Sequence, residues 1–171
     1  MDNSRHIILG IDPSVRGTGL GVIEIQGRSV LRCLYHQTIH IPQKVRFSAA
    51  IHIVADKIRE IVPAYQVQEA SIEEPPFVQN MSVHKKLCSV YGSILEALEG
   101  QDIPAYEFTP PEIKQSSTGY GKSEKDSVQK YIKWIFSLTT LPESDSADAL
   151  ATALTLANCY NQLVPAKLKR L

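Results

Sequence analysis

The sequence predicts an α/β fold in which a mixed sheet of five strands, the first three antiparallel, is flanked by α-helices. Residues 6–11 form a nearly continuous apolar run, which suits a strand buried on both faces. Two more strand-like segments follow across short turns, and from residue 46 onward amphipathic helices alternate with strands. A chain of 171 residues, 43% apolar and 21% charged, is long enough for a single domain. We expect residues 6–161 to form its core and the rest to be a short basic tail.

The first half of the chain is divided by glycine and proline. The first strand ends at Asp12-Pro13, and a glycine-rich turn over 14–19 leads to strands at 20–25 and 30–39. Apolar residues at three- and four-residue steps predict a helix over 46–62 that is stopped by Pro63. A fourth strand over 66–74 is ended by Pro75-Pro76.

The second half alternates in the same way. Ser82 is the expected N-cap of a helix that ends at Gly100, and residues 103–108 form a short fifth strand. Helical stripes follow over 128–136 and 145–160. The order of elements is therefore three strands, helix, strand, helix, strand and helices.

Charge and cysteine content restrict the function classes. Lys and Arg number 18, as do Asp and Glu, so a polyanionic partner would have to be bound through local basic patches. The three cysteines are far apart and predict reduced thiols rather than a zinc or redox motif. No apolar run is long enough to span a bilayer, so we expect a soluble cytoplasmic protein without a membrane partner.

Four carboxylates occur where predicted elements would direct them to one end of the sheet. Asp12 and Glu73 end strands, while Asp145 and Asp148 lie three residues apart at the start of the last helix. Carboxylate oxygens suit Mg²⁺, and two such ions can activate water for phosphodiester cleavage. The pattern indicates a nuclease. The alternative for the last pair, that Asp145 is a helix cap and Asp148 a first-turn acid, stays open.

An ordered set of motifs supports the nuclease interpretation. The chain resembles the RuvC-type Holliday junction resolvases of the RNase H-like superfamily over residues 7–160. The resemblance rests on Ile8-Leu9-Gly10-Ile11-Asp12-Pro13-Ser14, Ser71-Ile72-Glu73-Glu74-Pro75, Thr109-Pro110-Pro111-Glu112-Ile113-Lys114, Thr118-Gly119-Tyr120-Gly121 with Glu124-Lys125, and Asp145-Ser146-Ala147-Asp148-Ala149.

The resemblance implies an RNase H-like fold and a crossover junction endodeoxyribonuclease that nicks four-way DNA junctions symmetrically and leaves 5′-phosphates. It implies that two Mg²⁺ ions, replaceable by Mn²⁺, are bound by Asp12, Glu73, Asp145 and Asp148. Lys125 would be catalytic, stabilising charge on the phosphate. A homodimer would match the two-fold junction, and a branch-migration helicase is the expected partner. The implied DNA-binding residues are Lys114, Lys122, Phe77 and Tyr120.

Several positions depart from the family pattern. Ser14 stands where family members often have glycine, and Pro76 stands at the place of an aromatic residue, with Phe77 one position later. Either Phe77 or Tyr120 is a candidate wedge between bases. The helix over 83–98, with Val90, Tyr91 and Ile94, is a candidate dimer element. A non-catalytic junction-binding scaffold and a less selective branched-DNA nuclease remain as alternatives.

Overall fold

The computed structural model describes residues 5–26, 29–118, 125–160 and 169–171, and it contains a mixed sheet in the order β3-β2-β1-β4-β5-β6. The strands are β1 (Arg5–Asp12), β2 (Gly17–Gln26), β3 (Ser29–His40), β4 (Glu69–Glu73), β5 (Ala105–Phe108) and β6 (Lys169–Arg170). The helices are α1 (Phe47–Tyr65), α2 (Met81–Glu99), α3 (Pro110–Thr118), α4 (Lys125–Ile135) and α5 (Ser144–Tyr160).

The predicted arrangement of the first five strands is confirmed. Strands β1, β2 and β3 form the antiparallel meander, while β4 and β5 add in parallel to β1. The predicted number of strands is wrong by one, because β6 pairs antiparallel with β5 through Glu107↔Lys169. A two-residue strand has no periodicity that a sequence could reveal, so this part of the chain was predicted only as a basic tail.

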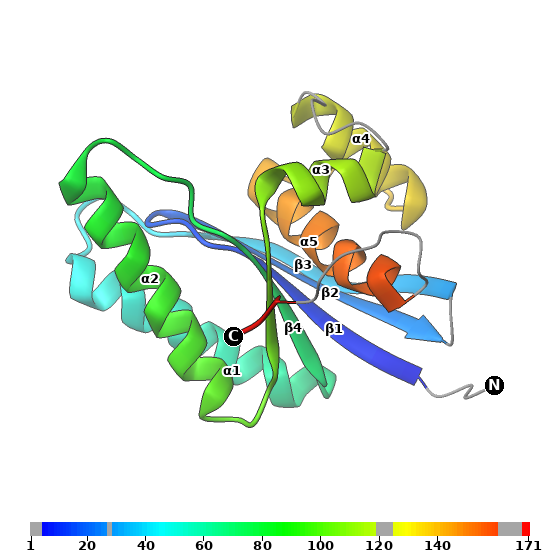
Figure 1. The fold of residues 1–171 in the computed structure, drawn as a ribbon, viewed down its shortest axis with the longest axis horizontal. Helices are drawn as coiled ribbons and strands as arrows, with labels where there is room; N and C mark the ends of the chain where they lie inside the picture. Colours follow the sequence, from blue (N-terminus) through cyan, green and yellow to red (C-terminus); the bar gives the residue numbers. More distant parts are fainter. Residues whose placement is uncertain (1–4, 27–28, 119–124, 161–168) are drawn as a thin grey trace.

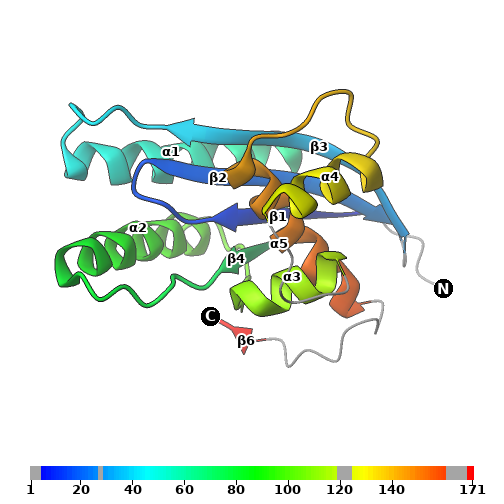
Figure 2. The same cartoon turned by 90° about the horizontal axis from the view of Figure 1, so that it is seen from above.

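Helices cover both faces of the sheet (Figures 1 and 2). On one face α1 and α2 lie side by side, and on the other α5 packs on β1 and β2, with α3 and α4 outside it. Each face has its own apolar core, one built around Ile58 and Ile94 and the other around Ile132 and Leu154. The central strand β1 is buried on both faces, as its unbroken apolar run predicts.

Two helix ends differ from prediction. Pro63 lies inside α1, which continues to Tyr65 and ends where Gln66 adopts a left-handed conformation. Proline has no N–H to donate to the carbonyl oxygen four residues earlier, and α1 ends two residues after it. Asn80, not Ser82, caps α2: its side-chain oxygen accepts hydrogen bonds from the backbone N–H groups of Ser82 and Val83.

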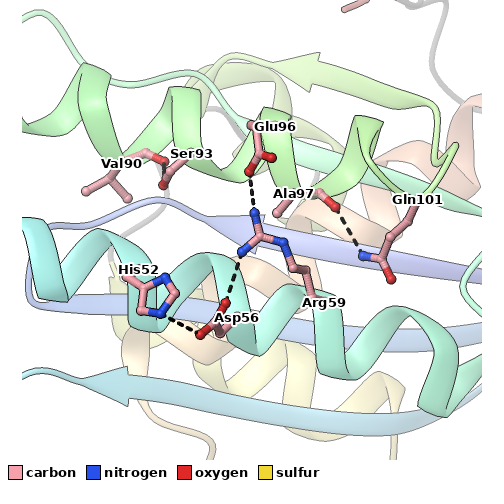
Figure 3. Close-up of polar contacts among 8 residues, drawn as sticks. All are labelled: His52, Asp56, Arg59, Val90, Ser93, Glu96, Ala97 and Gln101. Atoms are coloured by element: carbon pink, nitrogen blue, oxygen red, sulfur yellow. Dashed lines mark hydrogen bonds and ion pairs between the residues drawn. The ribbon is translucent and has the colours of Figure 1, made fainter.

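Polar contacts join α1 to α2 along their exposed edges (Figure 3). The guanidinium of Arg59 pairs with Asp56 on its own helix at 3.0 Å and with Glu96 on α2. Asp56 also contacts His52, 3.0 Å away. These groups are exposed to solvent, so the pairs add little stability and mainly favour one alignment of the two helices.

The three residues proposed as an apolar dimer surface on α2 are used by the fold of the single chain. Val90 and Ile94 are fully buried in the core shared with α1. Tyr91 is half-buried and its hydroxyl donates a hydrogen bond to Glu107 on β5. The helical period was read correctly, but sequence alone did not show that the core beneath α2 uses all three side chains.

The carboxylate of Glu69, at the start of β4, makes the stability of the fold depend on pH. Burial raises the pKa of Glu69, but hydrogen bonds from His6 and Tyr160 outweigh burial and hold it below its ordinary value. A carboxyl with a lowered pKa stabilises the fold above its unfolded value, about 4.3, and this contribution is lost as pH falls through the folded value. We expect urea unfolding to show a smaller loss of stability on acidification for Glu69→Gln than for wild type.

The exposed Glu99 provides a matched control for this substitution. Glu99→Gln should retain the pH dependence of the wild-type protein. Equal acid sensitivity of Glu69→Gln and wild type would contradict the role given to the Glu69 contacts.

None of the helices in the described ranges combines the length and apolar composition needed to span a bilayer.

Candidate active site

Two of the predicted carboxylates lie at neighbouring strand ends. Strands β1 and β4 run parallel with Ile11 paired to Ile72, so Asp12 and Glu73 follow one position later on each strand. Both residues are half-buried. The parallel register therefore brings together two acids that are 61 residues apart in the chain, as their predicted positions at strand ends require.

Glycines in the sheet allow α5 to approach the strands at backbone distance. A Cβ atom built on Gly10 would lie 2.0 Å from the carbonyl oxygen of Ala149, and one on Gly19 would lie 1.9 Å from that of Asp145. A Cβ on Gly21, which pairs with Gly10 across β1 and β2, would lie 2.8 Å from the Leu150 side chain and 3.0 Å from its backbone nitrogen. The sequence interpretation assigned Gly17 and Gly19 to a turn, but their main effect is to admit this helix.

Hydrogen bonds fix the position of α5 along the sheet. The buried hydroxyl of Ser71 on β4 donates to the carbonyl oxygen of Thr152 at 2.7 Å. The Thr152 hydroxyl in turn donates to the carbonyl oxygen of Asp148, one helical turn earlier, at 2.8 Å. Asp148 is therefore held on the helix turn that faces the ends of β1 and β4.

Three of the four acids line one cavity of about 470 Å³. Asp12, Glu73 and Asp148 share its wall with Lys114. The remaining lining residues come from the β1–β2 turn, the β4–α2 connection, α2, α3 and α4, and include Arg16, Pro76, Val83, Ile113 and Val128. Asp145 is outside this lining, and its carboxylate lies against Gly17, with Oδ2 2.9 Å from a Cβ built there.

The donor set of this cavity suits a hard divalent cation, because carboxylate oxygens are the ligands that Mg²⁺ and Mn²⁺ prefer. Within the described ranges, no three His, Cys, Asp or Glu side chains are grouped closely enough to hold one ion in their present positions. Carboxylates repel one another when no cation separates them, so some separation is expected.

The turn that follows Asp12 is locked by hydroxyl groups. Thr18 is fully buried, and its hydroxyl donates to the Ser14 carbonyl oxygen at 2.7 Å and accepts from the Ser14 N–H at 3.3 Å. The Ser14 hydroxyl accepts from the N–H of Arg16 at 3.5 Å, at the limit of a hydrogen bond. Both side chains therefore stabilise the turn.

Arg16 is a site residue that sequence reasoning missed. Its guanidinium lines the cavity and donates to the carbonyl oxygens of Pro42 at 2.9 Å and Val45 at 3.1 Å, with a longer contact to Gln43. The β3–α1 connection is thereby tied to the β1–β2 turn. A lone arginine in a turn gives no sequence signal for such a role, since its partners are backbone atoms.

We expect Arg16→Gln to lower the free energy of unfolding by about 1–2 kcal/mol, because hydrogen bonds from a charged donor to backbone carbonyls are lost. Urea denaturation measures the change. The exposed Arg46, which makes no side-chain capping bond at the start of α1, provides the control Arg46→Gln, expected to be nearly neutral. Equal stability of the two variants would show that the hydrogen bonds from Arg16 to the β3–α1 connection do not stabilise the fold.

The predicted DNA-binding residues lie in different settings. Lys114 is half-buried in the cavity wall. Phe77 is 82% exposed beside His84, with the ring centroids 5.8 Å apart, as a residue available for stacking would be. Lys125 begins α4, but its side chain lies outside the described part of the structure. Lys122 and Tyr120 lie outside the described residues altogether.

Comparison with known proteins identifies the family. The family model described as crossover junction endodeoxyribonuclease RuvC matches residues 8–156. The protein of that name from Petrotoga mobilis is 33% identical over 153 residues, which cover 89% of this chain and 93% of the relative.

Two solved structures are similar in fold. Thermus thermophilus RuvC, in a complex with a Holliday junction substrate, matches with a TM-score of 0.86 and 25% identity, covering 97% of this chain and 99% of that one. The yeast mitochondrial Holliday junction resolvase Ydc2 shares the fold at a TM-score of 0.65 and 9% identity, covering 91% and 79% of the two chains. The predicted RNase H-like fold class is confirmed, and the chain belongs to the RuvC family of crossover junction endodeoxyribonucleases.

Proposed function

We propose that this protein is a metal-dependent endodeoxyribonuclease that resolves four-way DNA junctions by paired, symmetric nicks. One observation carries the proposal: Asp12, Glu73 and Asp148 come from two strand ends and one helix to line a single cavity, in a chain that belongs to the RuvC family. The relative from Thermus thermophilus, whose complex contains a Holliday junction, supports the same class of substrate.

The acids of the cavity would hold the metal. We assign Asp12, Glu73 and Asp148, with Asp145 from the first turn of α5, as ligands of two Mg²⁺ ions that Mn²⁺ can replace. Metal held by these carboxylates would supply an activated water and charge neutralisation at the departing 3′ oxygen, so that the product would carry a 5′-phosphate. Asp145 must turn from Gly17 toward the cavity to join this set.

Basic side chains would orient the DNA strand. Lys114 stands in the cavity wall, where its ammonium group can hold a phosphate beside the carboxylates. We assign Lys125, by its place in the family motif, to stabilise negative charge that builds on the scissile phosphate. Phe77 is our candidate for stacking on a base at the crossover, because its ring is exposed near the same strand end.

Symmetric nicks require two sites related by symmetry, so we propose a homodimer. Sedimentation equilibrium of the purified protein tests this directly. A branch-migration helicase is the partner we expect to present the junction. A DNA substrate also agrees with the cytoplasm as the expected compartment.

The test is incubation of the protein with a labelled mobile four-way junction and with a matching linear duplex, in Mg²⁺, in Mn²⁺ and in EDTA. Paired metal-dependent nicks in the junction alone would establish the proposed activity. Cutting of both substrates would identify a less selective nuclease. Tight junction binding without cutting under either metal would identify a non-catalytic scaffold.

A further inference from the structure

The outer face of α4 carries an aromatic side chain that the fold does not use. Trp134 is the one tryptophan of the sequence, and 74% of it is exposed. Its neighbour Tyr131, one helical turn earlier, is half-buried, with the two ring centroids 6.2 Å apart. The opposite side of the helix is anchored by Val128 and Ile132, which are buried. Trp134 is therefore displayed on a rigid helix rather than packed into a core.

The charged residues next to Trp134 on α4 are basic. Lys130, one turn before it on the same face, is exposed, and the adjacent Lys133 is half-buried. Residues 127–135 contain no acidic residue. A large exposed indole flanked by ammonium groups fits a partner that combines negative charge with flat rings, and single DNA strands have both properties.

Helix α4 also contributes to the wall of the candidate active site. Val128, in the first turns of α4, lines the cavity that holds the carboxylates. Trp134 is six residues further along the helix, about 9 Å at 1.5 Å per residue. Helix α4 packs on α5 and α3 as the outermost layer on its side of the sheet (Figures 1 and 2). Trp134 therefore stands on the exposed side of a helix whose buried side forms part of the cavity wall.

We propose that the exposed face of α4, made of Lys130, Lys133 and Trp134, binds the DNA strand that leads away from the cleaved bond. The indole stacks on an unpaired base near the branch point, and the two lysines contact phosphates on either side. This inference rests on the proposed junction substrate and assigns a further binding residue to it. A base freed from pairing at a four-way crossover offers the flat ring face that intact duplex hides.

Because the chain has one tryptophan, its fluorescence reports directly on this contact. The experiment titrates a four-way junction into the protein in EDTA, so that nothing is cleaved, and follows the fluorescence together with the anisotropy of labelled DNA. We expect the fluorescence to fall and to saturate at the same junction concentration as the anisotropy. Trp134→Ala should weaken junction binding about 5- to 100-fold, and Trp134→Phe should restore most of the affinity.

The lysines have a distinct readout. Lys130→Gln and Lys133→Gln should each reduce the slope of log K against log salt concentration by about one, since each removes a phosphate contact. The control is Ile53→Ala, which trims an exposed apolar residue on α1, on the other face of the sheet. This control should leave both affinity and salt slope unchanged.

Three results would overturn the inference in different ways. Normal junction binding with unchanged fluorescence, and with Trp134→Ala as tight as Ile53→Ala, would show that α4 does not contact DNA while leaving the proposed function intact. Absence of any junction binding would remove the proposed function and this inference together. A fluorescence change that follows protein concentration without DNA would assign the face to contact between copies of the chain.

Discussion

Asp148→Asn is expected to abolish junction cleavage while leaving junction binding largely intact. Asp148 reaches the cavity from α5, and its amide replacement keeps the size of the side chain but removes a charged metal ligand. Loss of groups that only support metal ligands costs about 10- to 100-fold, so loss of a ligand should reduce the rate by at least about 100-fold. Cleavage is measured on a labelled junction in saturating Mg²⁺, and binding is measured by gel shift in EDTA.

The same chemical change at Asp102 is the control. Asp102 is exposed in the turn before β5, at the other end of the parallel strands, and has a positive φ of 56°, which asparagine tolerates well. Asp102→Asn should cleave as the wild type does. If Asp148→Asn lost binding together with cleavage, and if its unfolding midpoint also fell, Asp148 would support the fold rather than the chemistry.

Gly10→Ala is expected to destabilise the fold by about 3 kcal/mol or more. The added methyl would lie 2.0 Å from the carbonyl oxygen of Ala149 and 2.7 Å from the backbone nitrogen of Ala153. Backbone atoms of a packed helix cannot rotate away as a side chain can, so α5 must shift as a unit or β1 must bend. Overpacking of this kind reaches the upper end of measured costs. Chemical denaturation with urea measures the effect.

Glycine-to-alanine replacement at Gly92 provides a matched control. A Cβ there meets nothing within 4 Å, and Gly92 lies inside α2. Alanine has the higher helix propensity, so Gly92→Ala should stabilise the protein by up to about 1 kcal/mol. Two variants of identical chemistry would then shift stability in opposite directions. Similar stability for both would show that α5 does not lie against the sheet as closely as described.

The sequence predicted most elements because their signals are local. Apolar runs and helical stripes identified the first five strands and four of the five described helices, but not α3, and strand ends located Asp12 and Glu73 correctly. Helix ends were less certain: Pro63 does not stop α1, and Asn80 rather than Ser82 caps α2. In both cases the pattern placed the helix, while local features set its end: the left-handed Gln66 after α1, and two hydrogen bonds to the Asn80 side chain before α2.

The parts of the site that were not predicted from the sequence depend on contacts between distant segments of the chain. Arg16 binds backbone carbonyls 26 to 29 positions away, and no residue type marks those carbonyls. Gly10, Gly19 and Gly21 did carry a signal: Gly19 and Gly21 alternate along one strand, and Gly10 pairs opposite Gly21. Small residues on one sheet face indicate close approach of another backbone, and this reasoning would have placed α5 correctly.

The close contact of α5 with the glycines means that the active-site acids and the exposed face of α4 differ in how freely their sequences can change. The carboxylates of α5 are located by main-chain atoms on both sides, through Gly10 and Gly19, so their spacing does not depend on which side chains fill a core. Helix α4 packs on α5 and α3, outside this unit. Substitutions on its exposed face can therefore retune which DNA is held while the cutting geometry stays constant.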